Sequence, residues 1–324
     1  MKKLIVFITL LISVNSLVSQ RYFDERYISS LSFLNPVVIN PGATGYDGDH
    51  HILLNYRNKW ASFPGAPKSI LLSYDGPIAD RLGFGALLQT DSNGSLETSK
   101  FQGSFSYTID SPVNKIGFGI SAEYIQHGLS NDALLSGIPL DTEDQLLFER
   151  LAGSNFFDVS FGIHGLYDGK LTYGLMLPSL VSSRIDDSSV TSTDERELGY
   201  VFNLGYRFNE LDAGLVLEPS LYVKKFMNVP FHADINVLGR FLDDKLRGGV
   251  TYTVGADEKL GFLIGVGINT FNFTYAYNAS RHDFQTYNNG SHELSVRFDI
   301  ATNKSTMTDE KVEEMIEGQM MDNK

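Results

Sequence analysis

The chain has 324 residues, a formal net charge of −13 and no cysteine. A polypeptide this acidic is a poor partner for nucleic acid, because phosphate binding requires a basic surface. Without cysteine it can carry no lipoprotein anchor, no disulfide bond and no thiolate metal ligand.

The first nineteen residues have the pattern of a secretory signal. Two lysines precede an apolar run over residues 4–14, and small residues follow up to Ser19. Because the run is too short for a membrane-spanning helix, we predict a signal peptide over residues 1–19, cleaved before Gln20. No long apolar stretch follows it. The rest of the chain is therefore expected to leave the inner membrane.

Residues 20–47 form a separate N-terminal segment. It has too many large apolar side chains to be left in water, so we predict that it packs at the periplasmic mouth or as a plug in the lumen of the next domain. Its Asn-Pro pairs predict a defined, non-helical path and then a turn, because proline fixes φ and biases the preceding residue toward extended geometry. The candidate structural motif consists of Asn35, Pro36, Asn40, Pro41 and Gly45.

Residues 48–300 alternate between apolar and polar residues in a series of short segments. In the last of them, 291–300, the even-numbered residues from 294 onward are apolar and the odd-numbered residues from 293 onward are polar. A soluble β-sandwich also alternates in this way. Aromatic-rich apolar faces, opposite faces of Gly, Ser, Asn and charges, and lengths near about 9–11 residues favour strands that cross a membrane. We predict an all-β fold, a transmembrane antiparallel β-barrel of outer-membrane type with about 14 strands.

The expected strands have the following bounds: 51–56, 69–74, 82–89, 101–109, 116–124, 157–163, 171–177, 200–208, 213–224, 231–241, 246–254, 260–268, 271–279 and 291–300. Short gaps such as 242–245 and 269–270 alternate with long ones such as 127–154 and 178–196, although two gaps on the long side are short. Short turns are periplasmic and long loops extracellular in such barrels. We therefore expect a multi-pass protein with both termini in the periplasm.

A second motif lies in the first expected hairpin. Trp60 is the only tryptophan in the chain. The simplest role for Trp60 and Phe63 is to anchor the rim of the barrel at the membrane interface. Arg57 favours a binding role, because a guanidinium seeks a carboxylate or carbonyl partner, and because aromatic residues and arginine most often carry binding energy. The candidate binding motif at the outer rim consists of Arg57, Trp60, Phe63, Gly65, Ala66 and Pro67.

No pattern in the sequence indicates catalysis. Ser92-Asn93-Gly94 is similar to the Ser-Asn-Gly of outer-membrane phospholipases, but Thr90 stands where those enzymes have the histidine that activates the serine. We therefore expect no enzyme, no cofactor and no catalytic or metal-binding residues. Seven charged residues fall on the polar faces of strands and predict a network of paired charges in the lumen, with a solute-selecting constriction as the alternative: Glu123, Asp158, Glu218, Asp234, Arg240, Arg247 and Arg297.

Residues 301–324 form an acidic tail, expected in the periplasm. Thr308 is a suitable cap for a short helix, and apolar residues from Val312 to Met320 share a face at helical spacing. Such a short helix is marginal alone, so the tail is either frayed or docked on a periplasmic partner.

The two motifs resemble those of the PorP/SprF family of the type IX secretion and gliding-motility machinery of Bacteroidetes. That family has Asn-Pro-x-x-x-Asn-Pro-x-x-x-Gly, then Arg-x-x-Trp, then Gly-Ala-Pro. All of these stand here, from Asn35 to Pro67. The family usually has Ala-Tyr-Ala where this chain has Gly42-Ala43-Thr44.

The resemblance implies an outer-membrane barrel needed for export or surface anchoring of a particular secreted protein. Such clients are adhesin-like proteins with a type IX C-terminal sorting domain, and the implied partners are outer-membrane lipid, the secretion machinery and that client. The alternative is a porin or solute transporter, because about fourteen strands enclose an aqueous channel unless something fills it. A plug made by residues 20–47 would favour the binding and anchoring role.

Overall fold

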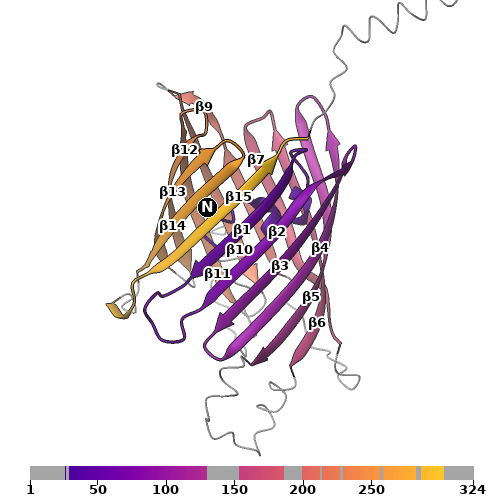
Figure 1. Ribbon diagram of the computed structural model, residues 1–324. Helices are drawn as coiled ribbons and strands as arrows, with labels where there is room; N and C mark the ends of the chain where they lie inside the picture. Colours follow the sequence, from indigo (N-terminus) through magenta and orange to yellow (C-terminus); the bar gives the residue numbers. More distant parts are fainter. Residues whose placement is uncertain are drawn as a thin grey trace, which may run out of the picture.

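The computed structural model describes residues 26, 29–129, 153–185, 199–211, 214–226, 229–255, 258–281 and 286–302. They form a closed antiparallel β-barrel of tilted strands (Figure 1). The strand segments are β1 (His50–Asn58), β2 (Lys68–Ala79), β3 (Leu82–Asn93), β4 (Leu96–Asp110), β5 (Asn114–Leu129), β6 (Ser154–Tyr167), β7 (Leu171–Arg184), β8 (Tyr200–Tyr206), β9 (Phe208–Leu211), β10 (Leu215–Phe226), β11 (Val229–Phe241), β12 (Leu246–Gly255), β13 (Lys259–Ile268), β14 (Phe271–Ser280) and β15 (Ser291–Ile300).

Two features of the pairing close the barrel with fourteen strands. β8 and β9 are two parts of one strand, interrupted at Arg207, and both pair with β10. The first and last strands, β1 and β15, pair along their length, and β10 pairs with β11. The predicted all-β barrel of about 14 strands is therefore confirmed.

The two faces of the barrel wall are the reverse of those in a soluble protein. On β4, Phe101 and Phe105 point outward and are 53% and 54% exposed, whereas Gln102 and Ser104 between them point inward and are buried. Large apolar groups on an outer surface belong in lipid, because water would make their exposure unfavourable. This distribution decides between the transmembrane barrel and the soluble sandwich. No helix among the described residues is long and apolar enough to span a bilayer.

All fourteen expected strands are present, and most are longer than the sequence pattern indicated. The interval between the expected strands 82–89 and 101–109 is strand on both sides of a two-residue turn at Gly94-Ser95. Polar residues occupy both faces of the strands in that interval, so the sequence shows no alternation of apolar and polar residues there. The predicted signal peptide, most of the two longest loops and the predicted tail helix lie outside the described residues.

The two ends of the barrel differ in the lengths of their connections. The end where β1 begins and β15 finishes also holds the short connections, such as residues 80–81 and 269–270. We call it the short-turn end. The opposite end holds the connections that contain residues 130–153 and 281–290. We call it the long-loop end.

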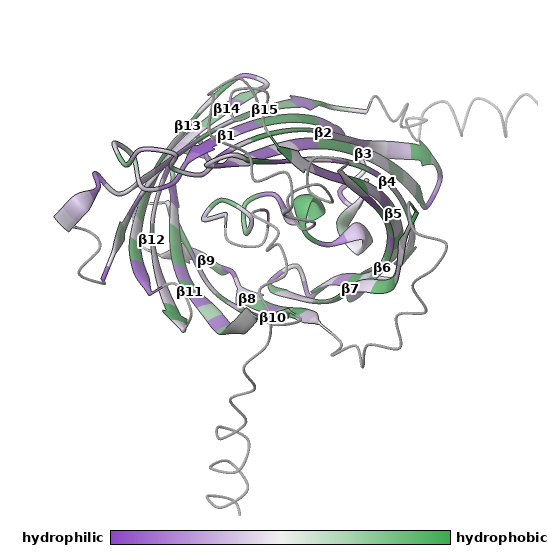
Figure 2. Cartoon of the chain, turned by 90° about the horizontal axis from the view of Figure 1, so that it is seen from below, coloured by the Kyte–Doolittle hydropathy of each residue, from purple (hydrophilic) through white to green (hydrophobic). Residues whose placement is uncertain are grey.

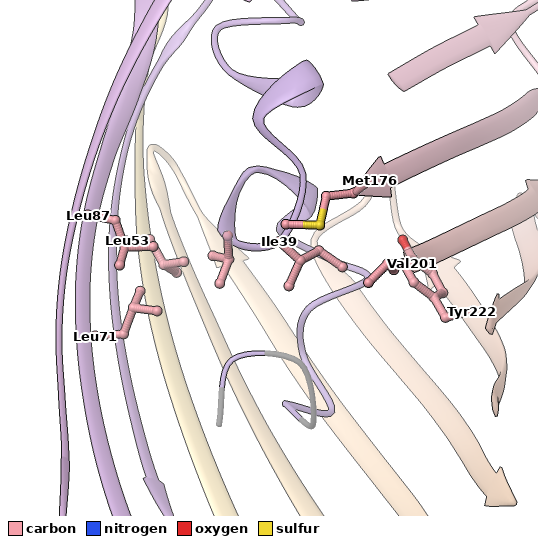
Figure 3. Packing of buried hydrophobic residues seen from close by; sticks show 8 residues of the cluster. Ile39, Leu53, Leu71, Leu87, Met176, Val201 and Tyr222 are labelled. Carbon is pink, nitrogen blue, oxygen red and sulfur yellow. The ribbon is translucent and has the colours of Figure 1, made fainter. Parts of the chain in front are cut away.

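Residue 26 and residues 29–47, which together we call the lumen segment, lie inside the barrel (Figure 2). Ile39 and its neighbour Val38 pack between two parts of the wall (Figure 3). On one side are leucines of β1, β2 and β3, and on the other are residues of β7, β8 and β10. The wall residues of this cluster are Leu53, Leu71, Leu87, Met176, Val201 and Tyr222.

A second apolar cluster holds Leu31 against a third part of the wall, on Leu238 of β11, Leu263 of β13 and Ala276 of β14. Full burial of one such leucine stabilises a fold by roughly 1.5–3 kcal/mol. The lumen segment and the barrel wall therefore form an apolar core together.

Candidate functional site

The Asn-Pro motif forms two successive single turns. Pro36 and Pro41 are the first residues of the 3-10 helices η2 (Pro36–Val38) and η3 (Pro41–Ala43). The Asn40 side chain accepts a hydrogen bond from Gly42 N and donates one to the Ile163 carbonyl of β6, both at 2.9 Å. The non-helical path expected here was wrong, because the fixed φ of proline suits the first helical position and asparagine is a good cap before it.

Four glycines of the barrel wall form a seat for these turns. They are Gly83 on β3, Gly117 and Gly119 on β5, and Gly162 on β6, and we call them the glycine seat. A Cβ atom on any of them would lie closer than 3.0 Å to the lumen segment. At three of the four positions the obstructing atoms include backbone, which cannot rotate away as a side chain can. Only glycine lets the segment approach the wall this closely.

Polar contacts fix the rest of the motif near the short-turn end. Gly45 N donates to the Asp75 carboxylate at 3.0 Å, and Thr44 bonds the hydroxyl of Ser104 at 3.0 Å. The Tyr46 hydroxyl donates to the Lys115 carbonyl at 2.6 Å. Burial raises the pKa of Tyr46 above its usual range, so the hydroxyl remains a donor.

The segment leaves the lumen beside an ion-pair cluster. His51 lies between Asp47, 2.8 Å from Nε2, and Asp299, 2.7 Å from Nδ1. A ring that donates from both nitrogens is the charged imidazolium, so it joins the segment to β1 and β15. Burial opposes the charged form of Asp47, but the hydrogen bond and charge of His51 lower the pKa of Asp47.

Toward the long-loop end the segment is held by charged groups. Arg26 forms a buried ion pair with Glu123 at 2.7 Å and also donates to Gln102. Ser30 donates through its backbone to Glu293 at 3.0 Å. Glu293 lies near the start of β15, at the long-loop end. The segment therefore runs through the lumen from the long-loop half to the short-turn end.

The candidate rim residues do not share one environment. Arg57, near the end of β1, points into the lumen and is buried. Trp60, just beyond β1, is half-buried and lines the same pocket as Arg57. Phe63 and Gly65 are exposed on the connection that follows. Ala66 is half-buried and Pro67 is buried.

The connection over residues 59–67, which we call the first loop, is tightly fixed. The backbones of Ala61 and the 286–290 connection exchange two hydrogen bonds, Ala61 N to Gly290 O at 2.7 Å and Asn289 N to Ala61 O at 2.8 Å. Trp60 has a φ of 54°. A bulky residue in this left-handed region is strained and persists only where its surroundings hold it. Phe63 N donates to the Trp60 carbonyl at 3.0 Å, so this member of the rim motif helps to hold Trp60 in place.

The pocket at the long-loop end also contains residues that the sequence did not single out. Lys59 places its ammonium 4.5 Å from the centre of the Trp60 ring, and Lys259 joins from the start of β13. Uncharged partners complete the lining: Ser30, Asn278, Ser280 and Ser291. Lys259 could have been found only by its place in the barrel, because a lone lysine at a strand end carries no signal.

The expected network of paired lumen charges is confirmed for most of its members. Asp234 pairs with Lys224 at 2.6 Å, and Asp158 accepts a hydrogen bond from Ser179 at 2.6 Å. The remaining partners are Arg26 for Glu123, Arg207 and Arg240 for Glu218, Asp244 for Arg240 and Arg247, and Asp299 for Arg297. Within the part of the chain that the structure describes, no three His, Asp or Glu side chains are grouped to hold a metal ion.

Comparison with known proteins gives one family and several distant structural neighbours. The family model described as type IX secretion system membrane protein PorP/SprF matches residues 22–298. No curated protein sequence matches the chain. Similar solved structures include the Ralstonia pickettii toluene transporter TbuX, at 12% identity over 84% of this chain and 93% of that one, with a TM-score of 0.47. Omp33 of Acinetobacter baumannii is 5% identical over 80% of this chain and 100% of that one, with a TM-score of 0.43.

Proposed function

This chain belongs to the PorP/SprF family of type IX secretion system membrane proteins, and from that premise we propose that it binds one secreted client protein at its long-loop end. Membership makes the barrel an outer-membrane component of that secretion system. The proposal adds the mode of action. The protein holds a client for export or surface anchoring, by binding and without catalysis.

The orientation in the membrane is part of the proposal. Short turns face the periplasm in outer-membrane barrels and longer loops face outward. We therefore place the short-turn end, with the start of β1 and the end of β15, in the periplasm. In that orientation the secretion machinery meets the short-turn end. The pocket of Arg57 and Trp60 opens toward the side where a translocated client emerges.

The lumen segment supports a binding role over a porin or solute transporter. It packs against different parts of the wall through Leu31 and Ile39, and it is fixed at both ends by polar contacts. A porin needs a continuous aqueous path. The wall has glycine at the four positions where a side chain would collide with the segment, so the wall and the segment fit each other.

The single observation that carries the client assignment is the convergence of Arg57 and a strained, fixed Trp60 on one pocket at the long-loop end. Interfaces obtain most of their binding energy from a few aromatic and arginine anchors, roughly 2 kcal/mol or more each. A rigid loop reduces the ordering cost of binding. These features fit a preformed recognition site better than a lipid anchor.

The test is the double variant Arg57→Ala with Trp60→Ala. We expect a heat-modifiable barrel at normal levels in the outer membrane and loss of the cognate secreted protein from the surface of intact cells. The matched control, Lys68→Ala with Tyr287→Ala, removes one cation and one aromatic ring from exposed positions at the same end, and should display the client normally. Normal display by the pocket variant would contradict the proposal.

A further inference from the structure

The pocket at the long-loop end concentrates positive charge in an otherwise acidic protein. Arg57, Lys59 and Lys259 line it together, although the chain carries a net charge of −13. The pocket lies between Ser30 of the lumen segment and the wall. Low-dielectric walls around charges of one sign focus the field on an entering ion.

The neighbouring charges are balanced within the protein. Lys224, near the long-loop end of β10, pairs with Asp234 at 2.6 Å. The field of the pocket therefore comes from Arg57, Lys59 and Lys259. Glu293, the cross-strand neighbour of Arg57, has its oxygens engaged by Ser29, Ser30 and Asn55.

The lining also suits a carboxylate in its geometry. Hydroxyls of Ser280 and Ser291 stand beside the cations as neutral donors. The Trp60 ring offers an apolar surface to the methylene groups of an acidic side chain. The lining cations have contacts within the protein already, so a ligand carboxylate would join an existing network. The fixed first loop keeps the pocket in shape before any ligand arrives.

We infer that this pocket binds the carboxylate side chains of an acidic peptide segment presented from the long-loop end. The inference rests on the proposed function, since the client supplies that segment. Arg57, Lys59 and Lys259 provide charge-assisted hydrogen bonds, and Trp60 packs against the aliphatic part of the bound side chain. An acidic segment is thereby distinguished from a neutral one of the same shape.

Trp60 is the only tryptophan, so its fluorescence reports on this pocket alone. The experiment titrates the full-length protein in detergent with a hexaglutamate peptide and, as the matched ligand, a hexaglutamine peptide. We expect a saturable change in Trp60 fluorescence with hexaglutamate, weakened by added salt, and none with hexaglutamine. Lys59→Gln with Lys259→Gln should weaken binding about tenfold. Lys68→Gln, which removes an exposed cation at the same end, should leave affinity unchanged.

Two results would overturn the inference. One is an equal response to both peptides. The other is an unchanged affinity in the Lys59→Gln, Lys259→Gln variant. If either of these occurs while the Arg57→Ala, Trp60→Ala variant still loses its client, the proposed function stands without this chemistry. Selective hexaglutamate binding with normal display by that variant would support the pocket chemistry and contradict the proposed function.

Discussion

The two halves of the lumen hold the same segment by different means. Near the short-turn end, the turns around Asn40 approach the backbone of β5 and β6 so closely that only glycine fits in the wall. Near the long-loop end, side chains carry the contacts, with Arg26 on Glu123 and Ser29 on Glu293. Close backbone contacts cannot rearrange without moving the whole segment, whereas side-chain ion pairs exchange partners. The short-turn half therefore suits permanent closure, and the long-loop half suits the client recognition proposed above.

Breaking the glycine seat should have the largest effect. Gly119→Leu with Gly162→Leu places side chains where the lumen segment now lies, and overpacking of this kind costs about 1–3 kcal/mol or more at each site. We expect the segment to be displaced and single-channel conductance in planar bilayers to rise well above that of the unaltered protein.

The matched control is Gly103→Leu, at an outward position where a Cβ meets nothing within 4 Å. It should conduct like the unaltered protein. A large conductance in the unaltered protein would favour the porin alternative. An unchanged conductance in a heat-modifiable seat variant would show that the glycines do not hold the segment.

Removing one partner of the Arg26–Glu123 pair should have the next largest effect. Both side chains are buried, and Glu123→Gln leaves a charged guanidinium without its counter-ion, which costs on the order of 3–5 kcal/mol. We expect faster cleavage of the lumen segment by added protease, with the barrel itself intact. Arg281→Gln, which breaks an exposed pair with Glu258, should change the rate little, because such pairs contribute about 0–1 kcal/mol. Equal rates in both variants would refute the difference between buried and exposed pairs.

The smallest effect is expected at the exit of the lumen segment. The pKa of Asp47 is lower in the folded protein than in the unfolded chain, so its contribution to stability is present above its ordinary pKa near 4 and lost as pH falls through the lower folded value. Asp47→Asn should therefore loosen the segment slightly at neutral pH and remove part of the response to acid below about pH 4. Protease sensitivity at both pH values, compared with Asp80→Asn on an exposed turn, measures this. An identical acid response in Asp47→Asn and the unaltered protein would rule out a role for this carboxylate.

Much of the barrel could be predicted because lipid and lumen impose a strict period of two. β4 shows this well from Phe101 to Ile109, where the inward residues are polar and the outward residues, apart from Gly103, are large and apolar. The pattern fails on β1, where Ile52, Leu53 and Leu54 are all apolar, so the facing of Arg57 could not be read. The structure turns Leu53 inward because it packs in the cluster of Ile39, and Arg57 follows it into the lumen.

The seat could be predicted only in part. Gly117 and Gly119 fall on the inward face of an expected strand, which indicates close approach by another backbone. The sequence does not show which segment approaches these glycines, because Pro41 meets Gly119 only after the barrel closes around the lumen segment. Adjacent apolar pairs such as Leu71-Leu72 and Leu87-Leu88 were a usable signal, since each supplies one leucine to lipid and one to the lumen cluster.

Under the proposed function, a client is bound at the long-loop end, outside the cell. A photo-crosslinking amino acid at Phe63, exposed on the first loop, tests this binding in intact cells, with the same group at Leu242, 69% exposed at the short-turn end, as the control. We expect a covalent adduct with the cognate secreted protein from position 63 and none from position 242. An adduct from position 242 alone, or none from position 63 in cells that display the client, would contradict the proposed function.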